Sequence, residues 1–103
     1  MNIFPKKSRT TLSREEERLV RAMQILGDST RFKIFKLLMT GDELCVTEIA
    51  AELKITLSAV SQHFRNFEMA GLVYKERMGQ KICYFLKDDS LVKELVVVAK
   101  AKK

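Results

Sequence analysis

Residues 46–72 read VTEIAAELKITLSAVSQHFRNFEMAGL and carry two short amphipathic patterns separated by a turn. Apolar residues recur in both patterns at the three- and four-residue spacing of a helix, namely Ile49, Ala50, Leu53, Val60, Phe64 and Phe67. Thr47 is predicted to be the N-cap of the first helix, and Thr56 or Ser58 that of the second. The small side chain of Ala50 lets two helices approach closely. The stretch therefore predicts a pair of crossing helices joined by Ile55 to Leu57.

Two further helices are expected before this pair. Ser13 followed by Glu16 matches a capping box, and apolar residues at helical spacing then run to Gly27, which is a stop signal. Asp28 or Ser29 caps the next helix, whose apolar residues cover more than one face. We expect this second helix to lie at the centre of the core.

A hairpin and a last helix are expected after the pair. Residues 72–77 and 81–86 are rich in apolar, β-branched and aromatic residues, and Met78, Gly79 and Gln80 separate them. Asp88 or Asp89 then begins a helix from Leu91 to about Ala101. Its apolar surface is more than a small monomer can easily cover.

This order of elements describes an α+β fold that is mainly α: a winged helix-turn-helix with five helices and a β-hairpin wing (α-α-α-α-β-β-α). A chain of 103 residues is enough for one domain, which we place at residues 13–101 behind a flexible basic arm at residues 1–12. The chain has no apolar run long enough to span a bilayer and no apolar stretch typical of a secretion signal near Met1. We therefore expect a cytoplasmic protein.

The charge distribution favours a polyanionic partner near the hairpin. The net charge is +6, but seven basic residues lie at the two ends and the rest of the chain is close to neutral. Between Lys54 and Lys81 the balance is locally positive, because five basic residues face only Glu68 and Glu76.

The second helix of the pair has the dimensions and side chains of a DNA-reading helix. The major groove of B-DNA accepts one α-helix, and residues near the start of that helix reach the base edges. Gln62 can pair with adenine, and Arg65 can bind guanine or a phosphate. The hairpin would place its cations along the neighbouring backbone. The residues predicted to contact DNA on this basis are Thr47, Thr56, Ser58, Ala59, Ser61, Gln62, His63, Arg65, Lys75, Arg77 and Lys81.

Two other classes of function were weighed against DNA binding. Exposed serine, glutamine and arginine residues are ordinary on a small helical domain, so the fold could instead serve as a protein-interaction module that does not read DNA. An enzyme is disfavoured, because no carboxylate pair, no nucleophile beside a base and no glycine-rich phosphate loop is apparent. No cofactor is expected.

Four motifs in this order resemble the ArsR/SmtB family of bacterial and archaeal repressors: LGDSTRFKI at residues 26–34, ELCVTEIA at 43–50, SAVSQHF at 58–64 and AGLV at 70–73. The resemblance implies a homodimer built from the first and last helices, which binds an inverted-repeat operator and represses transcription. It also implies that Arg31 lies near the DNA backbone. The residues expected at the dimer interface are Leu19, Val20, Met23, Leu91, Leu95, Val96, Val98 and Ala99.

The metal sites that many family members use are not matched here. The thiolate site typically reads Glu-Leu-Cys-Val-Cys, but Thr47 stands at the second cysteine position, which leaves Cys45 as a single ligand where three or four are needed. The site on the last helix would use Asp88 and a histidine, but Ser90 stands at the histidine position. We therefore predict no metal site.

A thiol sensor remains open as an alternative. Cys45 at the start of the helix pair and Cys83 on the hairpin could report oxidation or electrophiles if either thiol had a lowered pKa. The simpler interpretation is that both are small buried residues. Because the two cysteines are far apart in a chain with no export signal, we expect free thiols and no disulfide. The operator and any effector are not given by the sequence.

Overall fold

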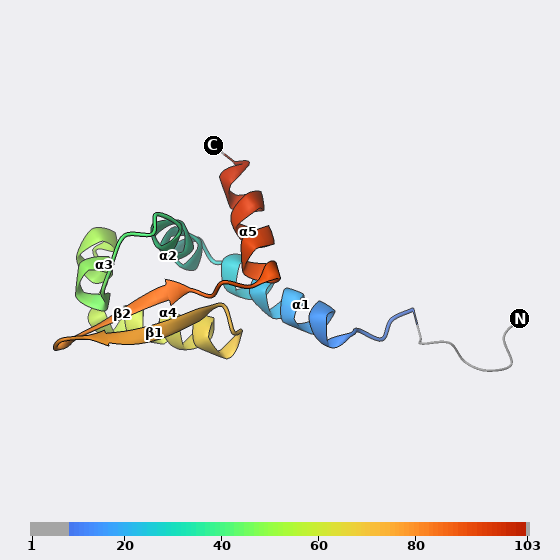
Figure 1. The fold of residues 1–103 in the computed structure, drawn as a ribbon, viewed down its shortest axis with the longest axis horizontal. Coiled ribbons are helices and arrows are strands. Elements are labelled where there is room, and N and C mark those ends of the chain that lie inside the picture. Colours follow the sequence, from blue (N-terminus) through green and yellow to red (C-terminus); the bar gives the residue numbers. More distant parts are fainter. Residues whose placement is uncertain (1–8, 103) are drawn as a thin grey trace, which may run out of the picture.

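The computed structural model describes residues 9–102, and most of the predicted basic arm at residues 1–12 lies outside this range. The structure has five helices and one antiparallel hairpin, whose tip projects away from the helices (Figure 1). The elements are, in order, α1 (Arg14–Leu26), α2 (Ser29–Met39), α3 (Val46–Leu53), α4 (Leu57–Met69), β1 (Val73–Met78), β2 (Lys81–Leu86) and α5 (Ser90–Lys100). This is the predicted winged helix-turn-helix. Within the described residues, no helix is long and apolar enough to cross a membrane.

The helix starts follow from local capping. The capping box of α1 is confirmed, since Ser13 Oγ accepts from the Glu16 N–H at 3.1 Å and Glu16 Oε1 accepts from the Ser13 N–H at 2.9 Å. Asp28, one of the two predicted candidates, caps α2 by accepting from the Arg31 N–H at 3.0 Å. That hydrogen bond lowers the pKa of the Asp28 carboxyl below its ordinary value. Each cap satisfies backbone donors that the helix cannot pair internally.

The core forms around α2, as predicted. Ile34 and Phe35 have no exposed surface, and Leu38 is almost as well covered. Phe64 and Phe67 of α4 are also fully buried and belong to the same cluster. The helix that carries the predicted reading face is therefore fixed to the body of the domain by its opposite, apolar face.

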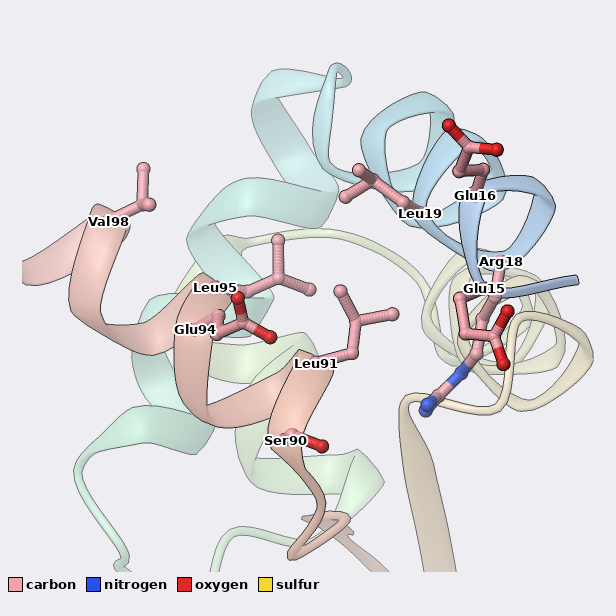
Figure 2. Close-up of a pocket in the computed structure, with 9 residues that line it drawn as sticks. All are labelled: Glu15, Glu16, Arg18, Leu19, Ser90, Leu91, Glu94, Leu95 and Val98. Carbon is pink, nitrogen blue, oxygen red and sulfur yellow. The ribbon is translucent and has the colours of Figure 1, made fainter. Parts of the chain in front are cut away.

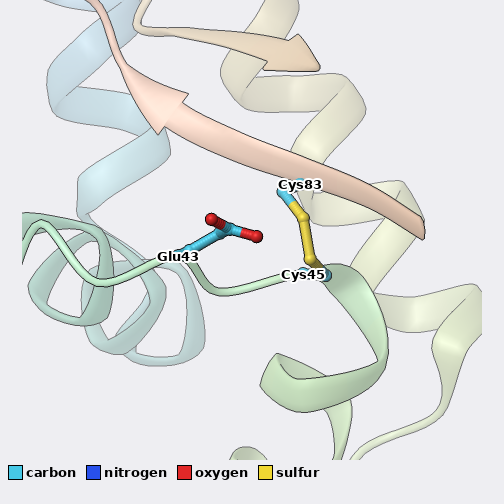
Figure 3. Close-up of side chains that lie close together, drawn as sticks. All are labelled: Glu43, Cys45 and Cys83. Atoms are coloured by element: carbon cyan, nitrogen blue, oxygen red, sulfur yellow. A yellow bond between two sulfur atoms is a disulfide. The ribbon is translucent and has the colours of Figure 1, made fainter. Parts of the chain in front are cut away.

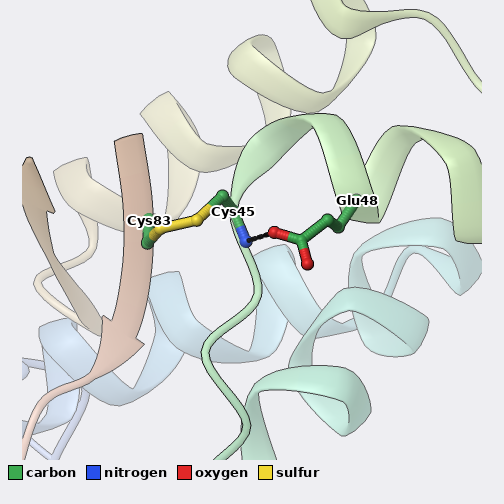
Figure 4. The surroundings of a disulfide bond; sticks show 3 residues. All are labelled: Cys45, Glu48 and Cys83. Atoms are coloured by element: carbon green, nitrogen blue, oxygen red, sulfur yellow. Dashed lines mark hydrogen bonds between the residues drawn. A yellow bond between two sulfur atoms is a disulfide. The ribbon is translucent and has the colours of Figure 1, made fainter. Parts of the chain in front are cut away.

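Helix α3 begins two residues earlier than the sequence indicated. Its N-cap is Cys45 and not Thr47, because Glu48 Oε1 reaches back and accepts from the Cys45 N–H at 3.0 Å (Figure 4). The prediction of Thr47 as the N-cap was wrong, and Thr47 lies in the first turn. Glutamate at the third helical position is the reciprocal half of a capping box. It marks Cys45, three residues before it, as the start of the helix.

A short turn joins α3 to α4. Lys54 ends α3 in the left-handed conformation with φ of 57°, and its N–H bonds back to α3 carbonyls. Thr56, one of the two predicted candidates, caps α4 by accepting from the Ala59 N–H at 3.0 Å. The helix pair predicted from residues 46–72 is confirmed.

The hairpin has a tighter turn than predicted. Met78 pairs with Lys81, so Met78 belongs to β1 and only Gly79 and Gln80 remain in the turn. Gly79 has φ of +67°, which glycine adopts without the steric cost that a side chain would add. The register then pairs Val73 with Leu86 at the base of the wing.

Aromatic stacking fixes the wing to α4. The rings of Phe64 and Tyr84 lie 4.0 Å apart between centroids, with their planes at 4°. The Tyr84 hydroxyl donates to Glu68 Oε1 at 3.3 Å. Burial, together with the Glu68 charge, raises the pKa of Tyr84 above its ordinary value. One strand of the wing is therefore packed directly on the helix predicted to read DNA.

A single arginine joins three distant segments. Arg18 Nη2 of α1 donates to the Gly71 carbonyl at 2.6 Å and to Asp89 Oδ2 at 2.8 Å. Gly71 is in the turn between α4 and β1, where its φ is +69°. Asp89 is the N-cap of α5 and also accepts from the Val92 N–H at 3.1 Å. We call this arrangement of Arg18, Gly71 and Asp89 the Arg18 junction.

Candidate nucleic-acid interface and sulfur cluster

The polar face of α4 is open to solvent. Ser58, Ser61, Gln62 and Arg65 are exposed, whereas Ala59 is half-buried. Arg65 Nη1 donates to Gln62 Oε1 at 2.9 Å, so the amide and the guanidinium form one polar unit one turn apart. Thr56 is exposed at the start of the same helix. The structure thus brings these predicted DNA-binding residues together on one helix.

The wing contributes exposed cations. Lys75 and Arg77 of β1 and Lys81 of β2 are all exposed. Lys75 Nζ lies 3.9 Å from Glu68 Oε2, a separation at which an exposed ion pair is weak. Cationic side chains on the hairpin therefore remain available to an anionic partner.

The other predicted DNA contacts have different surroundings. Thr47 is exposed in the first turn of α3. Arg31 is half-buried, and its Nε donates to the Ile25 carbonyl at 2.8 Å, so its guanidinium pairs with the last turn of α1. His63 is half-buried, and its Nδ1 is buried without a hydrogen-bond partner among the described residues. None of these observations tests contact with DNA, which stays a prediction for all three.

A groove of about 450 Å³ separates α1 from α5 (Figure 2). Leu19, Leu91, Leu95 and Val98, all predicted at a dimer interface, line it together with charged residues at its edge. The remaining predicted residues lie close by: Val20 and Met23 are exposed on α1, Val96 is half-buried on α5, and Ala99 is buried against the core of its own chain. Much of the predicted interface is thus exposed apolar surface. Ala99 is already covered.

Cys45 and Cys83 are joined by a disulfide bond (Figure 4). The prediction of two free thiols was wrong. The two residues are 38 positions apart in sequence, but Cys45 forms a one-residue antiparallel bridge with the outer edge of β2 at Cys83. This pairing places their Cα atoms 3.9 Å apart. The prediction that both cysteines are buried is confirmed, at 2% and 0% exposure.

Glu43 completes a cluster with the two cysteines. A carboxylate oxygen of Glu43 and the two sulfur atoms lie within 4.8 Å of one another (Figure 3). Among residues 9–102 this is the one such group of three or more side chains with metal-ligand atoms. The premise that Cys45 would stand alone as a ligand was therefore wrong. The family's second cysteine position, Thr47, is not part of the cluster.

Two groupings of side chains could not be predicted from the sequence, for the same reason. The Arg18 junction and the Glu43–Cys45–Cys83 cluster both depend on contacts between residues far apart in the chain. One local signal for the cluster was available: Glu43 and Cys45 are two positions apart in an extended link, which places both side chains on the same side. No comparable signal marks Arg18 among the other charged residues of α1.

Comparison with known proteins agrees with this geometry. Residues 28–75, which contain α2, α3, α4 and the start of the wing, match the model of the bacterial regulatory protein arsR family. The HTH-type transcriptional regulator CmtR of Mycobacterium bovis is 34% identical over 86 residues, which cover 82% of this chain and 71% of CmtR. The chain belongs to the arsR family. Because this is a family of regulatory proteins, the prediction that the chain is not an enzyme is confirmed.

Other arsR-family relatives are matched over a smaller part of their length. The cadmium resistance transcriptional regulatory protein CadC of Listeria innocua is 34% identical over 65 residues, which cover 63% of this chain and 55% of CadC. The chain thus spans little more than half of that relative.

Solved structures share the fold of this chain. HlyU from Vibrio vulnificus superposes with a TM-score of 0.70 at 28% identity, covering 84% of this chain and 88% of that one. HlyU from Vibrio cholerae gives a TM-score of 0.77 at 24% identity, covering 87% and 96%.

Proposed function

We propose that the protein is a cytoplasmic transcriptional repressor that binds an inverted-repeat operator as a homodimer. The observation that carries this proposal is the exposed polar face of α4 together with the exposed cations of the wing, which the Phe64–Tyr84 stack packs against α4. A single α-helix fits the major groove of B-DNA, and exposed cations beside it can neutralise phosphates.

Each part of this surface has a distinct role. Gln62 and Arg65 enter the major groove and contact base edges, and their mutual hydrogen bond orients both side chains before DNA is bound. Ser58 and Ser61 contact phosphates or bases at the start of α4. Lys75, Arg77 and Lys81 neutralise phosphates beside the major groove. Thr47, Thr56, Ala59 and His63 contribute at the edges of this footprint, and Arg31 approaches the backbone while still holding α1.

Dimerisation follows from the apolar surface of α1 and α5. Met23 is 61% exposed and Val98 is 60% exposed, and the groove between the helices is lined by Leu19, Leu91, Leu95 and Val98 together with charged and polar residues. A second copy of the chain that covers this surface would present two α4 helices to two half-sites. The proposal therefore couples the interface on α1 and α5 to operator symmetry.

Fluorescence anisotropy with a labelled duplex from the gene's own upstream region tests the proposal. The Gln62→Ala plus Arg65→Ala variant is expected to lose specific binding and to keep weak, salt-sensitive binding to any duplex. Lys100→Ala is the control, because it removes an exposed cation in the last turn of α5, and α5 ends away from the wing (Figure 1). Wild-type affinity in the double variant would show that α4 does not read the operator.

A thiol-responsive repressor is a second candidate, which the Cys45–Cys83 disulfide favours. The bond ties the start of α3 to a wing strand, and both elements belong to the proposed DNA-binding surface. Breaking it would remove the covalent cross-link and leave the Cys45–Cys83 backbone bridge and the Phe64–Tyr84 stack, so the wing would be held less firmly against the helix pair. Operator affinity is then expected to differ between oxidised and reduced wild type, and not to respond to reductant in a Cys45→Ser plus Cys83→Ser variant. Equal affinities of the two wild-type forms would exclude this candidate.

A further inference from the structure

We propose that the reduced form of the protein binds one thiophilic divalent cation, such as Zn²⁺ or Cd²⁺, through Cys45, Cys83 and Glu43. Glu43 and Cys45 lie two residues apart in the link before α3, and Cys83 lies on strand β2 (Figure 3). The site lies within one chain and includes a wing residue. It differs from the Cys45–Thr47 pattern considered from the sequence.

The chemistry of the cluster suits such an ion. Two cysteine thiolates and one carboxylate are ligands that Zn²⁺ accepts, and a solvent molecule can take the fourth tetrahedral position. Glu43 is exposed, so its side of the cluster is open to solvent, whereas both sulfur atoms belong to buried residues. The ion would therefore be held on its inner side by sulfur and on its outer side by oxygen.

The geometry requires only a small change once the disulfide is reduced. Two sulfurs on a tetrahedral ion with Zn–S bonds of about 2.3 Å are separated by roughly 3.8 Å. The three ligand atoms already lie within 4.8 Å of one another. The Cys45–Cys83 backbone bridge keeps both cysteines side by side, so rotation of the two side chains can separate the sulfurs without displacing either element.

Cys45 is the N-cap of α3. Glu48 is held by its hydrogen bond to the Cys45 N–H on the backbone side of the same residue (Figure 4). Glu43, and not Glu48, is therefore the carboxylate that completes the site.

The disulfide and the metal ion exclude each other. A cellular dithiol reductant supplies two electrons and two protons to the S–S bond, which breaks to give two thiols while the reductant becomes a disulfide. Metal binding then transfers one proton from each thiol to solvent as the two sulfur–metal bonds form. Under the proposed cytoplasmic location thiols are kept reduced, so the dithiol form is the one that meets metal ions.

Cadmium titration of the reduced 103-residue chain, without DNA, tests the site. We expect one Cd²⁺ per chain, with the ultraviolet thiolate-to-metal charge-transfer band, and no such binding by the oxidised chain. Loss of a direct ligand in Cys83→Ser should weaken Cd²⁺ binding at least by the roughly 10–100-fold that loss of an outer-shell partner costs. Circular dichroism of each variant checks that it is folded.

Glu43→Gln keeps the experiment decisive if a buried cysteine variant misfolds, because Glu43 is exposed. This variant is expected to bind Cd²⁺ more weakly with the charge-transfer band retained. Asp42→Asn removes a neighbouring exposed carboxylate outside the cluster and is expected to bind as wild type does. Equal affinity in wild type, Glu43→Gln and Cys83→Ser, or equal binding by the oxidised chain, would overturn the site. Because no DNA is present, either result leaves the proposed operator binding to its own test.

Discussion

Phe64 of α4 and Tyr84 of β2 stack face to face with their ring centroids 4.0 Å apart, and this contact sets the position of the wing relative to the reading helix. Phe64→Ala is expected to lower the free energy of unfolding by about 3–5 kcal/mol, because the side chain is fully buried. Tyr84→Phe keeps the ring and removes only the hydrogen bond to Glu68, so about 1 kcal/mol is expected. Urea unfolding measures both, and equal losses would contradict the role of stacking.

Arg77 on the wing is expected to bind DNA phosphates through its charge and not to distinguish one DNA sequence from another. Arg77→Ala should weaken binding to operator and to unrelated duplexes by a similar factor, and should reduce the slope of log affinity against log salt by about 1. Gln62→Ala should instead reduce the difference in affinity between operator and unrelated duplexes. Anisotropy titrations at several salt concentrations separate the two patterns. A selective loss of operator binding in Arg77→Ala would place this residue among the base contacts.

The exposed apolar surface of α5 is expected to be the dimer contact. Val98→Asp places a charge on a 60% exposed residue that lines the α1–α5 groove, so the variant should be a folded monomer near 11.9 kDa by light scattering. Operator binding should weaken with it, because a monomer contacts one half-site. Val98→Ala serves as the control and should remain dimeric. A dimeric Val98→Asp variant would move the interface to another surface.

The free energy of unfolding is expected to depend on the ionisation of Asp89 at low pH. Although burial works to raise it, the hydrogen bonds from Val92 and Arg18 hold the pKa of Asp89 below its ordinary value of 3.8. Its contribution to stability is therefore complete above the ordinary pKa and is lost as the pH falls through the lower folded-state pKa. Asp89→Asn retains a good N-cap and loses the charge. The Asp89→Asn variant should therefore have a lower free energy of unfolding than wild type at about pH 6, and this difference should become smaller below about pH 3.

The disulfide is expected to contribute to stability independently of any signalling role. It closes a loop across 38 positions, and such a cross-link typically stabilises a domain by about 2–4 kcal/mol. Thermal unfolding of wild type should shift to lower temperature when a dithiol reductant is added. The Cys45→Ser plus Cys83→Ser variant should unfold at the same temperature with and without reductant. A reductant effect in that variant would point to something other than this bond.

Local sequence signals predicted the elements of the fold well, because capping and periodicity act over a few residues. Ser13 with Glu16 gave the start of α1, and Val60, Phe64 and Phe67 gave the buried face of α4. The error at Thr47 was also local: Thr47 is the commoner N-cap residue type, but the Glu48 side chain selects Cys45. The hydrogen bond from the Cys45 N–H to Glu48 therefore determines that α3 starts after Cys45 and not after Thr47.

The candidate sites were predictable only in part. The polar residues of α4 share one helical face by spacing alone, so their grouping followed from the sequence. The pairing of Cys45 with Cys83 depends on which edge of the hairpin faces the link before α3. Helical and strand periodicity carry no information about that edge. The Glu43–Cys45–Cys83 cluster therefore became visible only when the wing was placed against α3.

The Arg18 junction has a consequence for how far apart two reading helices would stand. Arg18 belongs to α1, Asp89 starts α5, and Gly71 ends the turn that leaves α4, so one guanidinium connects both proposed interface helices to the base of the reading helix. In a dimer, a tilt of α5 against α1 would be passed to α4 in each chain. The centre-to-centre distance between the two α4 helices, which must match about 34–36 Å for half-sites one DNA turn apart, would change with it. Arg18 would then help to set the distance between the two α4 helices without contacting DNA itself.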